Sequence, residues 1–184
     1  MVVKIDKEIG NEHFYKKAIQ IVNESKVFRG AAKTPALILP SERESPERKE
    51  YCDALMKKIK GGNIKVKYLF SLPRTEEEII TGTNASGVEQ WEEIRREWQE
   101  LIRYKNVDLR WVDHDDFISC IIGNHHTLIG WKGLEDRKIS AITYLNNEMC
   151  FYKDSFDMIF EKASNDNEKA INRIENKLKE SHLI

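Results

Sequence analysis

The sequence predicts an α/β domain built on a mixed β-sheet that is flanked by helices on both faces. Segments with helical and with strand periodicity alternate over the first 111 residues. Four β-rich runs then follow one another between residues 107 and 145, and two helical segments close the chain. Strands that follow so closely predict hairpins, so the sheet is not purely parallel.

The amino-terminal part predicts two helices with a strand between them. Four apolar residues at helical spacing predict a helix over residues 12–26, namely Phe14, Ala18, Ile21 and Val22. The apolar run 36–39, directly before Pro40, predicts a short buried strand. Ser45 and Pro46 are typical of a helix start, and Gly61 is typical of its end. The buried stripe of this second helix is expected to contain Tyr51, Leu55 and Ile59.

The next part predicts a strand, a turn and a long helix. Residues 64–70 alternate between apolar side chains and lysines, as a strand with one wet face does. The sequence 75–78 resembles a capping box, and residues 81–87 predict a mobile loop. A helix over 88–102 follows, in which Trp91 and Trp98 share one face and are expected in the core or at an interface.

The carboxyl-terminal part predicts strands at 107–111, 117–122, 127–131 and 139–145 and then two helices. The first of these helices is expected to bury Phe156 and Phe160, and Asp166 is expected to cap the second. We divide the chain into an α/β domain, 1–164, and a charged helix, 165–184. This helix either packs on the domain or meets a partner.

Composition limits the function classes. The 184 residues are 40% hydrophobic and 33% charged. The net charge of −1 predicts no strong overall attraction to nucleic acid or to an anionic membrane, but a local basic patch is still possible. No apolar run approaches the roughly 18 residues that cross a bilayer, and the first residues do not resemble a signal peptide. Three well-separated cysteines predict buried free thiols in a reducing compartment, the cytoplasm.

Three stretches carry a resemblance to a known family. They are residues 14–23, residues 51–70 and, most specifically, residues 116–160, with an Asn146-x-Glu148 motif and a closing helix. Together they resemble a phospholipase D-like half-domain over residues 12–163. In that family the chemistry uses a His, a Lys two positions later and an Asp seven positions after the His. Counting back from Gly130 places Asp116, Ile118 and Gly123 at these positions.

The resemblance therefore implies the family's fold without its catalytic signature. An acid in place of the attacking imidazole repels an anionic phosphate, and Ile118 supplies no positive charge. Whether the chain is an enzyme stays unresolved, with a non-catalytic domain favoured. In active members the Asn-x-Glu groups border the catalytic pocket, so Asn146 and Glu148 are expected to border a ligand site here.

The candidate ligand-binding residues are Arg74, Asp116, Trp131, Lys132, Asn146 and Glu148. Arg74 and Lys132 are the nearest cations for an anionic ligand, although either could be a solvated side chain. Trp131 either fills the former phosphate site or stacks on a sugar or base. The acidic run 113–116 is a loop or a cation-binding rim.

The dipeptide His125-His126 predicts a hairpin turn, and the alternative is a proton-transfer or metal pair. Adjacent strand residues point to opposite faces, so the two rings make a poor chelate. No cofactor and no metal site are predicted.

Three functions follow as alternatives. The first is a non-catalytic ligand-sensing, regulatory or assembly domain with a small-molecule effector, working alone or with a separate DNA-binding chain. The second is a phosphodiesterase or nuclease that uses substitute residues, such as His126 with Glu148, at a dimeric site. The third is a structural domain that binds another protein. A homodimer is expected in each case, and a membrane partner in none.

Overall fold

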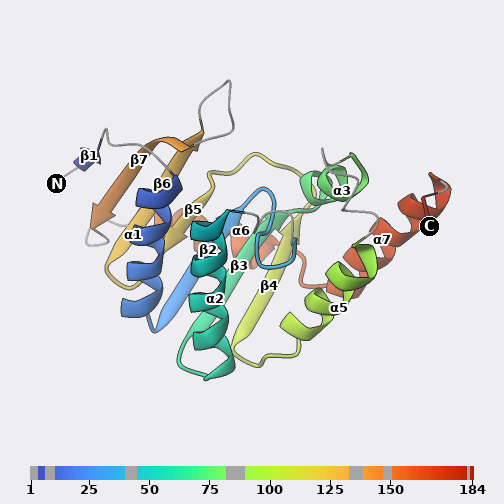
Figure 1. The fold of residues 1–184 in the computed structure, drawn as a ribbon, viewed down its shortest axis with the longest axis horizontal. Coiled ribbons are helices and arrows are strands. Elements are labelled where there is room, and N and C mark those ends of the chain that lie inside the picture. The colour runs from blue at the N-terminus through green and yellow to red at the C-terminus, as the bar shows by residue number, and fades with distance from the viewer. Residues whose placement is uncertain are drawn as a thin grey trace.

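A computed structural model describes residues 4–6, 11–39, 45–81, 90–132, 139–146, 151–181 and 183–184 of the chain. Seven strands form one sheet in the order β1-β7-β6-β5-β2-β3-β4 (Figure 1). The strands are β1 (Lys4–Asp6), β2 (Val27–Ala32), β3 (Lys65–Ser71), β4 (Val107–Val112), β5 (Cys120–Ile122), β6 (His126–Lys132) and β7 (Ile139–Asn146). No helix among the described residues is long and apolar enough to cross a membrane.

The sheet is mixed, as the sequence predicts. Strands β2, β3 and β4 are parallel, whereas β5, β6, β7 and β1 continue the sheet through antiparallel pairs. The change of direction occurs at β2. This strand pairs with β3 in parallel along one side and with the three residues of β5 in antiparallel orientation along the other. The expected α/β class is therefore confirmed.

Helices cover both faces of the sheet, but unequally (Figure 1). The helices are α1 (Asn11–Glu24), α2 (Pro46–Lys60), α3 (Leu72–Thr81), α5 (Trp91–Leu101), α6 (Phe151–Lys162) and α7 (Asn167–Glu180). All of these except α6 contribute to one large core cluster. On the opposite face, α6 packs Phe156 and Phe160 against Ala31, Leu69 and Val112.

Local signals explain where α2 begins and ends. The Ser45 side chain accepts a hydrogen bond from the Arg48 N–H, which satisfies one of the amides that the first helical turn leaves without a partner. At the other end, Gly61 caps the helix and Gly62 adopts a positive φ of 66°, a conformation that costs glycine little. The predicted helix is confirmed, with Tyr51, Leu55 and Ile59 buried.

Helix α7 packs on the rest of the chain. Trp98 Nε1 donates to Asn167 Oδ1 at 3.0 Å, and Asn167 Nδ2 donates to the Leu109 carbonyl at 2.9 Å. Asp166 caps the helix, as expected, by accepting from the Lys169 N–H. The apolar side of α7 joins the large core cluster through Ala170, Ile171, Ile174 and Leu178. The division of the chain after residue 164 stays a prediction.

A buried carboxylate fixes α3 against α7. Glu76 is almost fully buried and forms ion pairs with Arg173 and Lys177 of α7. Arg173 Nη2 donates a hydrogen bond to Glu76 Oε2 at 3.1 Å, and Arg173 Nε lies 2.5 Å from Glu76 Oε1 as a charge contact without hydrogen-bond geometry. Because burying an unpaired carboxylate is costly, the two cations are what allow Glu76 to lie there.

Two strand predictions are wrong. Residues 36–38 form a turn, in which the Ile38 and Leu39 N–H groups both donate to the Pro35 carbonyl. The strand between α1 and α2 is instead β2, in which Arg29 interrupts the run of apolar and small residues. This charge is tolerated because Arg29 Nε donates to Asp157 Oδ1 of α6 at 2.9 Å. The two residues are 128 positions apart in the sequence.

The strand predicted over 117–122 is also too long, because only Cys120–Ile122 pair with β2. The predicted loop over 81–87 lies, apart from Thr81, outside the described residues. The turn predicted at 75–78 is wrong, because these residues lie inside helix α3, where the Thr75 hydroxyl donates to the Ser71 carbonyl. The other strand and helix predictions agree with the structure to within a few residues at their ends.

Gly123 gives a direct test of how the turn between β5 and β6 packs on the end of α1. A Cβ atom at this position would lie 2.3 Å from Ser25 Oγ and 2.6 Å from Ile21 Cγ2, both at the end of α1. We therefore expect Gly123→Ala to lower the free energy of unfolding by about 1–3 kcal/mol, as measured by urea denaturation.

The matched control is Gly61→Ala. Gly61 has a helical φ of −76°, and the nearest neighbour of an added Cβ is the mobile end of the Asn63 side chain. We expect this variant to stay within about 0.5 kcal/mol of the wild type. Equal stability of the two variants would contradict the packing of the β5–β6 turn on α1.

Candidate functional site

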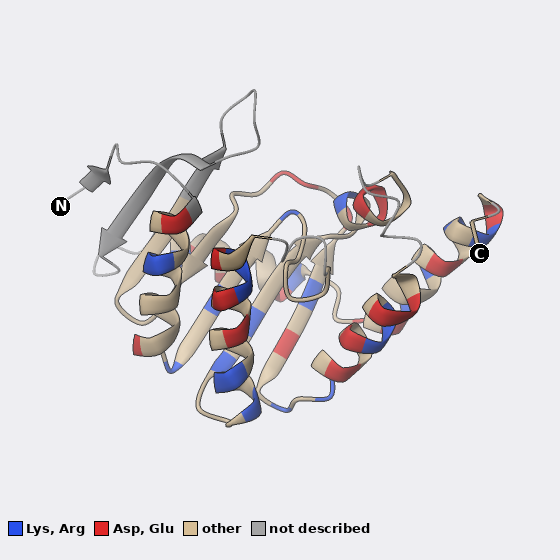
Figure 2. Cartoon of the chain, in the orientation of Figure 1, with Lys and Arg blue, Asp and Glu red and all other residues tan. Residues whose placement is uncertain are grey.

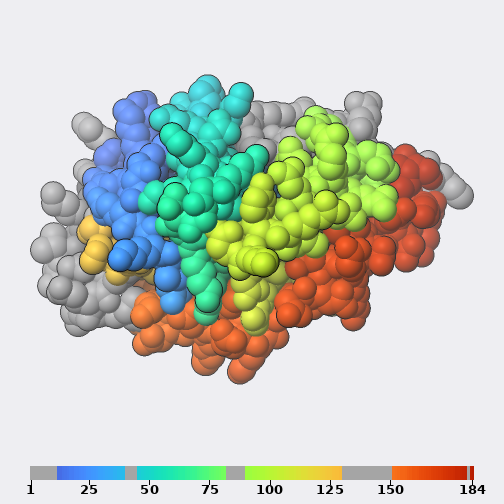
Figure 3. Space-filling model, turned by 90° about the horizontal axis from the view of Figure 1, so that it is seen from below, coloured from blue at the N-terminus to red at the C-terminus, as the bar shows by residue number. Residues whose placement is uncertain are grey.

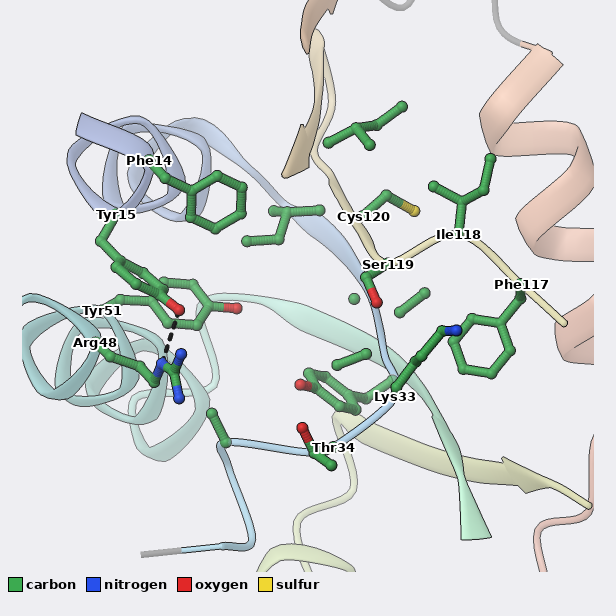
Figure 4. A pocket seen from close by; sticks show the side chains of 17 residues that line it. Phe14, Tyr15, Lys33, Thr34, Arg48, Tyr51, Phe117, Ile118, Ser119 and Cys120 are labelled. Carbon is green, nitrogen blue, oxygen red and sulfur yellow. Dashed lines mark hydrogen bonds between the residues drawn. The ribbon is translucent and has the colours of Figure 1, made fainter. Parts of the chain in front are cut away.

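A cavity of about 470 Å³ opens between α1, α2 and the carboxyl ends of β2 and β3 (Figure 4). Its fourth wall is the segment 117–121, which leads into β5. Seventeen residues line it: Phe14, Tyr15, Gly30, Ala31, Ala32, Lys33, Thr34, Ala36, Arg48, Tyr51, Tyr68, Phe117, Ile118, Ser119, Cys120, Ile121 and Ile129.

The short length of β5 explains why this space is not filled by the sheet. Cys120 pairs with Ala31, so β2 extends beyond the last residue that β5 can cover. The chain before Cys120 leaves the sheet and forms a wall of the cavity, with Ile118 46% exposed. The cavity thus lies at the carboxyl edge of the parallel strands, where open α/β sheets commonly bind ligands.

Aromatic rings form much of the cavity wall. The Phe14 and Tyr15 rings meet edge to face, with their centroids 5.2 Å apart, and the centroids of the Tyr15 and Tyr51 rings are 5.8 Å apart. Gly30 allows the Tyr68 ring to lie against β2, because a Cβ atom at this position would come within 2.8 Å of that ring. Such rings offer flat apolar surface to a ligand and carry hydroxyl groups at their ends.

Polar groups lie at separate points around these rings. Arg48 Nε donates to the Tyr15 hydroxyl at 2.8 Å, and the guanidinium carbon lies 5.7 Å from the Tyr15 ring centroid. Lys33 and Ser119 come from other walls of the cavity (Figure 4). The cavity therefore has cations on two of its sides.

Tyr51 contributes a protonated hydroxyl. Burial and the nearby Tyr68 raise the pKa of Tyr51 well above its ordinary value. Within the described part of the chain its hydroxyl makes no hydrogen bond, and Figure 4 shows it directed toward the centre of the cavity. This group can donate to an acceptor on a bound molecule.

The acidic run before the cavity is held by cations. Arg74 Nε donates to Asp115 at 2.8 Å, and Lys33 lies 3.7 Å from the same carboxylate. The hydrogen bond from Arg74, with the charge of Lys33, lowers the pKa of Asp115. Arg74 also pairs with Glu77 at 2.6 Å. These contacts join Asp115 to Arg74 of α3 and to Lys33, and each adds little stability because the cations are exposed.

Of the six predicted ligand-binding residues, two lie outside the cavity and two others lie far apart along one strand pair, and the set as a whole stays a prediction. Neither Arg74 nor Asp116 lines the cavity, and Asp116 is an exposed loop residue. Trp131 pairs with Ala141 whereas Asn146 pairs with His126, so Trp131 and Asn146 lie at opposite ends of the β6–β7 ladder.

Of the two remaining predicted residues, the structure describes one. Lys132 pairs with Ile139 at the end of β6, and Glu148 lies outside the described residues. His125 is exposed in the β5–β6 turn, as the sequence predicts, and His126 Nδ1 lies 3.6 Å from a Glu24 carboxylate oxygen. The parts of the chain that are described contain no group of three metal-ligating side chains.

Sequence reasoning missed the cavity residues because most of them look like core. Phe14 and Tyr51 occupy the buried stripes of their helices, and nothing in the pattern distinguishes a ring that borders a cavity from one that is packed on all sides. The one available signal was Gly30, a glycine inside a strand, which is typical of close approach by another group.

Comparison with known proteins gives a likeness of fold. No family model matches the sequence, and no curated protein matches it. Among solved structures, that of TrmBL2, described as an archaeal chromatin protein with a novel mode of DNA binding, matches with a TM-score of 0.52 at 16% identity. The match covers 90% of this chain and 55% of the TrmBL2 chain, so this chain spans about half the length of TrmBL2. At that identity the likeness concerns the fold alone.

The predicted membership of the phospholipase D-like family is therefore corrected. No family model supports it, and a solved structure that shares the fold, that of TrmBL2, is described as an archaeal chromatin protein. The geometry also departs from the family's requirement that the His and Lys positions project from one strand, because Asp116 and Ile118 lie in a loop before β5. The supposed Asp position, Gly123, packs so tightly on α1 that it has no room for a side chain.

The rate at which the Cys120 thiol is alkylated tests whether this part of the cavity wall is closed to water. Burial raises the pKa of this thiol to about 12. At about pH 8 its thiolate is therefore roughly a thousandfold rarer than that of an ordinary cysteine, and we expect iodoacetamide to alkylate it correspondingly slowly. Peptide mass spectrometry measures the rate at this residue.

The control is the same chain unfolded in guanidinium chloride, in which Cys120 recovers an ordinary rate. If the native and unfolded rates differed by less than about tenfold, the wall formed by segment 117–121 would not protect the thiol as described.

Proposed function

We propose that this chain is a non-catalytic regulatory domain that binds a small organic molecule in the cavity between α1, α2 and segment 117–121. The observation that carries the proposal is the cavity itself, about 470 Å³ in volume and lined by rings and aliphatic side chains with a few polar groups. Cavities of this size and lining are typical of ligand sites, where apolar walls supply affinity and polar groups fix orientation.

The lining favours one class of ligand. The Tyr15, Tyr51 and Phe117 rings suit a flat or ring-shaped body. Arg48 and Lys33 favour a ligand with an anionic or acceptor-rich end, and the Tyr51 hydroxyl offers a further donor. We therefore expect an aromatic or cyclic molecule that carries a carboxylate, a phosphate or several hydroxyls.

The cavity's chemistry supports binding over catalysis. Its one thiol, Cys120, is held protonated by burial, and the hydroxyl of Tyr51 is held protonated as well. Neither is activated as a nucleophile, because activation requires a lowered pKa or an adjacent base. His125 of the β5–β6 turn and His126, the first residue of β6, do not line the cavity.

The regulatory part of the proposal rests on the likeness to TrmBL2. That protein is described as a DNA-binding chromatin protein, and it is about twice as long as the part that this chain matches. A ligand-binding domain of the same fold suits a role in which the ligand adjusts a DNA-bound assembly. Pairing of two copies and the identity of any protein partner stay predictions.

Thermal unfolding tests the proposal against a panel of nucleotides, aromatic carboxylates, sugars and sugar phosphates, with 1-anilinonaphthalene-8-sulfonate as a fluorescent probe. A ligand present at about one hundred times its Kd stabilises the folded state by about 2.7 kcal/mol, which raises the Tm by several degrees. We expect at least one member of the panel to do so and to displace the probe.

Two matched variants locate the effect. Tyr51→Phe removes the cavity hydroxyl with little change in volume, and we expect it to weaken binding about threefold to tenfold, in line with the loss of one hydrogen bond. Tyr104→Phe removes a hydroxyl that bonds to Glu100 at 3.0 Å, outside the cavity, and leaves binding unchanged. A panel without any stabilising member, or equal loss in both variants, would overturn the proposal.

A further inference from the structure

The amino ends of the three parallel strands form a basic edge. Lys26 directly precedes β2, Lys65 begins β3, and Lys105 lies just before β4. The Lys65 N–H donates to the Lys26 carbonyl and the Val66 N–H donates to the Asn106 carbonyl, so the three strand starts lie side by side. Adjacent strands are spaced by about 4.8 Å, which places these three positions in a row across about 10 Å.

Neighbouring elements extend this row. Helix α2 ends on the same side with Lys57, Lys58 and Lys60, and Arg103 lies in the turn between α5 and β4. Figure 2 shows the cations along the lower edge of the molecule, and Figure 3 views that edge directly, with the end of α1, the end of α2 and the turn before β4 adjacent. We call the seven residues Lys26, Lys57, Lys58, Lys60, Lys65, Arg103 and Lys105 the basic edge.

Most of these charges are not neutralised within the described part of the chain. All of them except Lys58 are exposed. Lys58 donates to the Asn23 carbonyl at 2.6 Å, and Lys60 lies 3.8 Å from Glu100. The other five form no ion pair with a described residue, although the chain as a whole carries a net charge of −1.

Of the acids near the edge, Glu100 pairs with Lys60, and two others are engaged by groups outside the edge. Glu24 faces His126 at 3.6 Å, and Asp108 forms two hydrogen bonds with Arg110. On the α6 side of the sheet, Asp157 and Glu161 are shared among Arg29, Lys67 and Arg110. The fold therefore satisfies its internal cations on that face and leaves those of the edge directed to solvent.

The composition of the edge distinguishes between two kinds of polyanion. Surfaces that bind lipid bilayers combine cations with exposed aromatic or long aliphatic side chains that enter the interface. The large apolar side chains that are exposed in the described part, Ile118, Phe151, Met158, Leu183 and Ile184, all lie outside the basic edge. Between the cations lie the small or polar residues Gly61, Gly62 and Asn63, and Tyr104, which is half-buried and packs against the large core cluster.

We infer that the basic edge binds the phosphate backbone of double-stranded nucleic acid without reading its sequence. A row of cations matches a linear polyanion, which carries one charge per about 1.7 Å of duplex axis. The edge offers six lysines, which act as point charges toward phosphates, and one arginine. Its cations lie at strand starts, a helix end and a turn, and the one ring among them, Tyr104, packs against the core, so the edge suits phosphates rather than bases. This surface is at the opposite end of the parallel strands from the cavity, so the inference does not rest on ligand binding.

Fluorescence anisotropy of a labelled duplex of about 20 base pairs, followed at rising salt concentration, tests the inference. We expect the wild-type chain to bind with a Kd in the micromolar range at low salt and to lose affinity steeply as salt rises. Lys26→Ala/Lys65→Ala/Lys105→Ala should weaken binding at least about tenfold and reduce the slope of log K against log salt by roughly 2.7, about 0.9 for each lost phosphate contact.

The control removes the same charge elsewhere. Lys153, Lys162 and Lys169 lie on α6 and α7, and Lys153→Ala/Lys162→Ala/Lys169→Ala should retain wild-type binding. Circular dichroism confirms that both triple variants are folded. Absence of duplex binding by the wild type, equal loss in both triple variants, or binding to phosphatidylserine vesicles without binding to the duplex would each overturn the inference.

Discussion

The unequal lengths of β2 and β5 are the constraint on which the site depends. Strand β2 has six residues, whereas β5 has three and therefore covers only Arg29, Gly30 and Ala31 of β2. The chain before β5 cannot continue the ladder and forms a wall beside α1 and α2 instead. If β5 began at Phe117, as its apolar sequence suggests, the sheet would extend into the space that the cavity occupies.

Helix α2 connects the two proposed surfaces. Its first turns carry Arg48 and Tyr51 at the cavity, and its last turn carries Lys57, Lys58 and Lys60 at the basic edge. With a rise of about 1.5 Å per residue, about 15 Å of continuous helix separates Arg48 from Lys58. A rigid element that contacts both sites is one physical route for coupling between them, and a ligand that displaced α2 would alter the position of both.

Much of the fold could be predicted from the sequence because its elements follow local rules. The cap at Ser45, the glycines after α2 and the apolar spacing of α1, α5 and α7 each act within a few residues of the chain. Strand β2 could not be predicted in this way, since the charge of Arg29 is compensated by Asp157, which the sequence does not place beside it. Residues 36–39 looked like a strand for the converse reason: they are buried by the tertiary fold while their backbone turns.

The site was less predictable than the fold. The family resemblance aligned Gly123 with a catalytic position, whereas its surroundings show a glycine selected for close packing against Ser25 and Ile21. A motif alignment reports residue types, but it contains no information on which side chains face a common space. The cavity depends on where β5 begins, and this start is set by contacts between residues that are about 90 positions apart in the sequence.

The central claim is that a small molecule occupies the cavity at the carboxyl edge of β2 and β3. Methyl NMR on isotope-labelled isoleucines addresses it, because Ile118, Ile121 and Ile129 line the cavity and Ile171 and Ile174 lie in the core around α7. During titration with 1-anilinonaphthalene-8-sulfonate or with a stabilising ligand, the account predicts shifts confined to the three cavity methyls. Shifts spread over all five, or absent from the three, would contradict it.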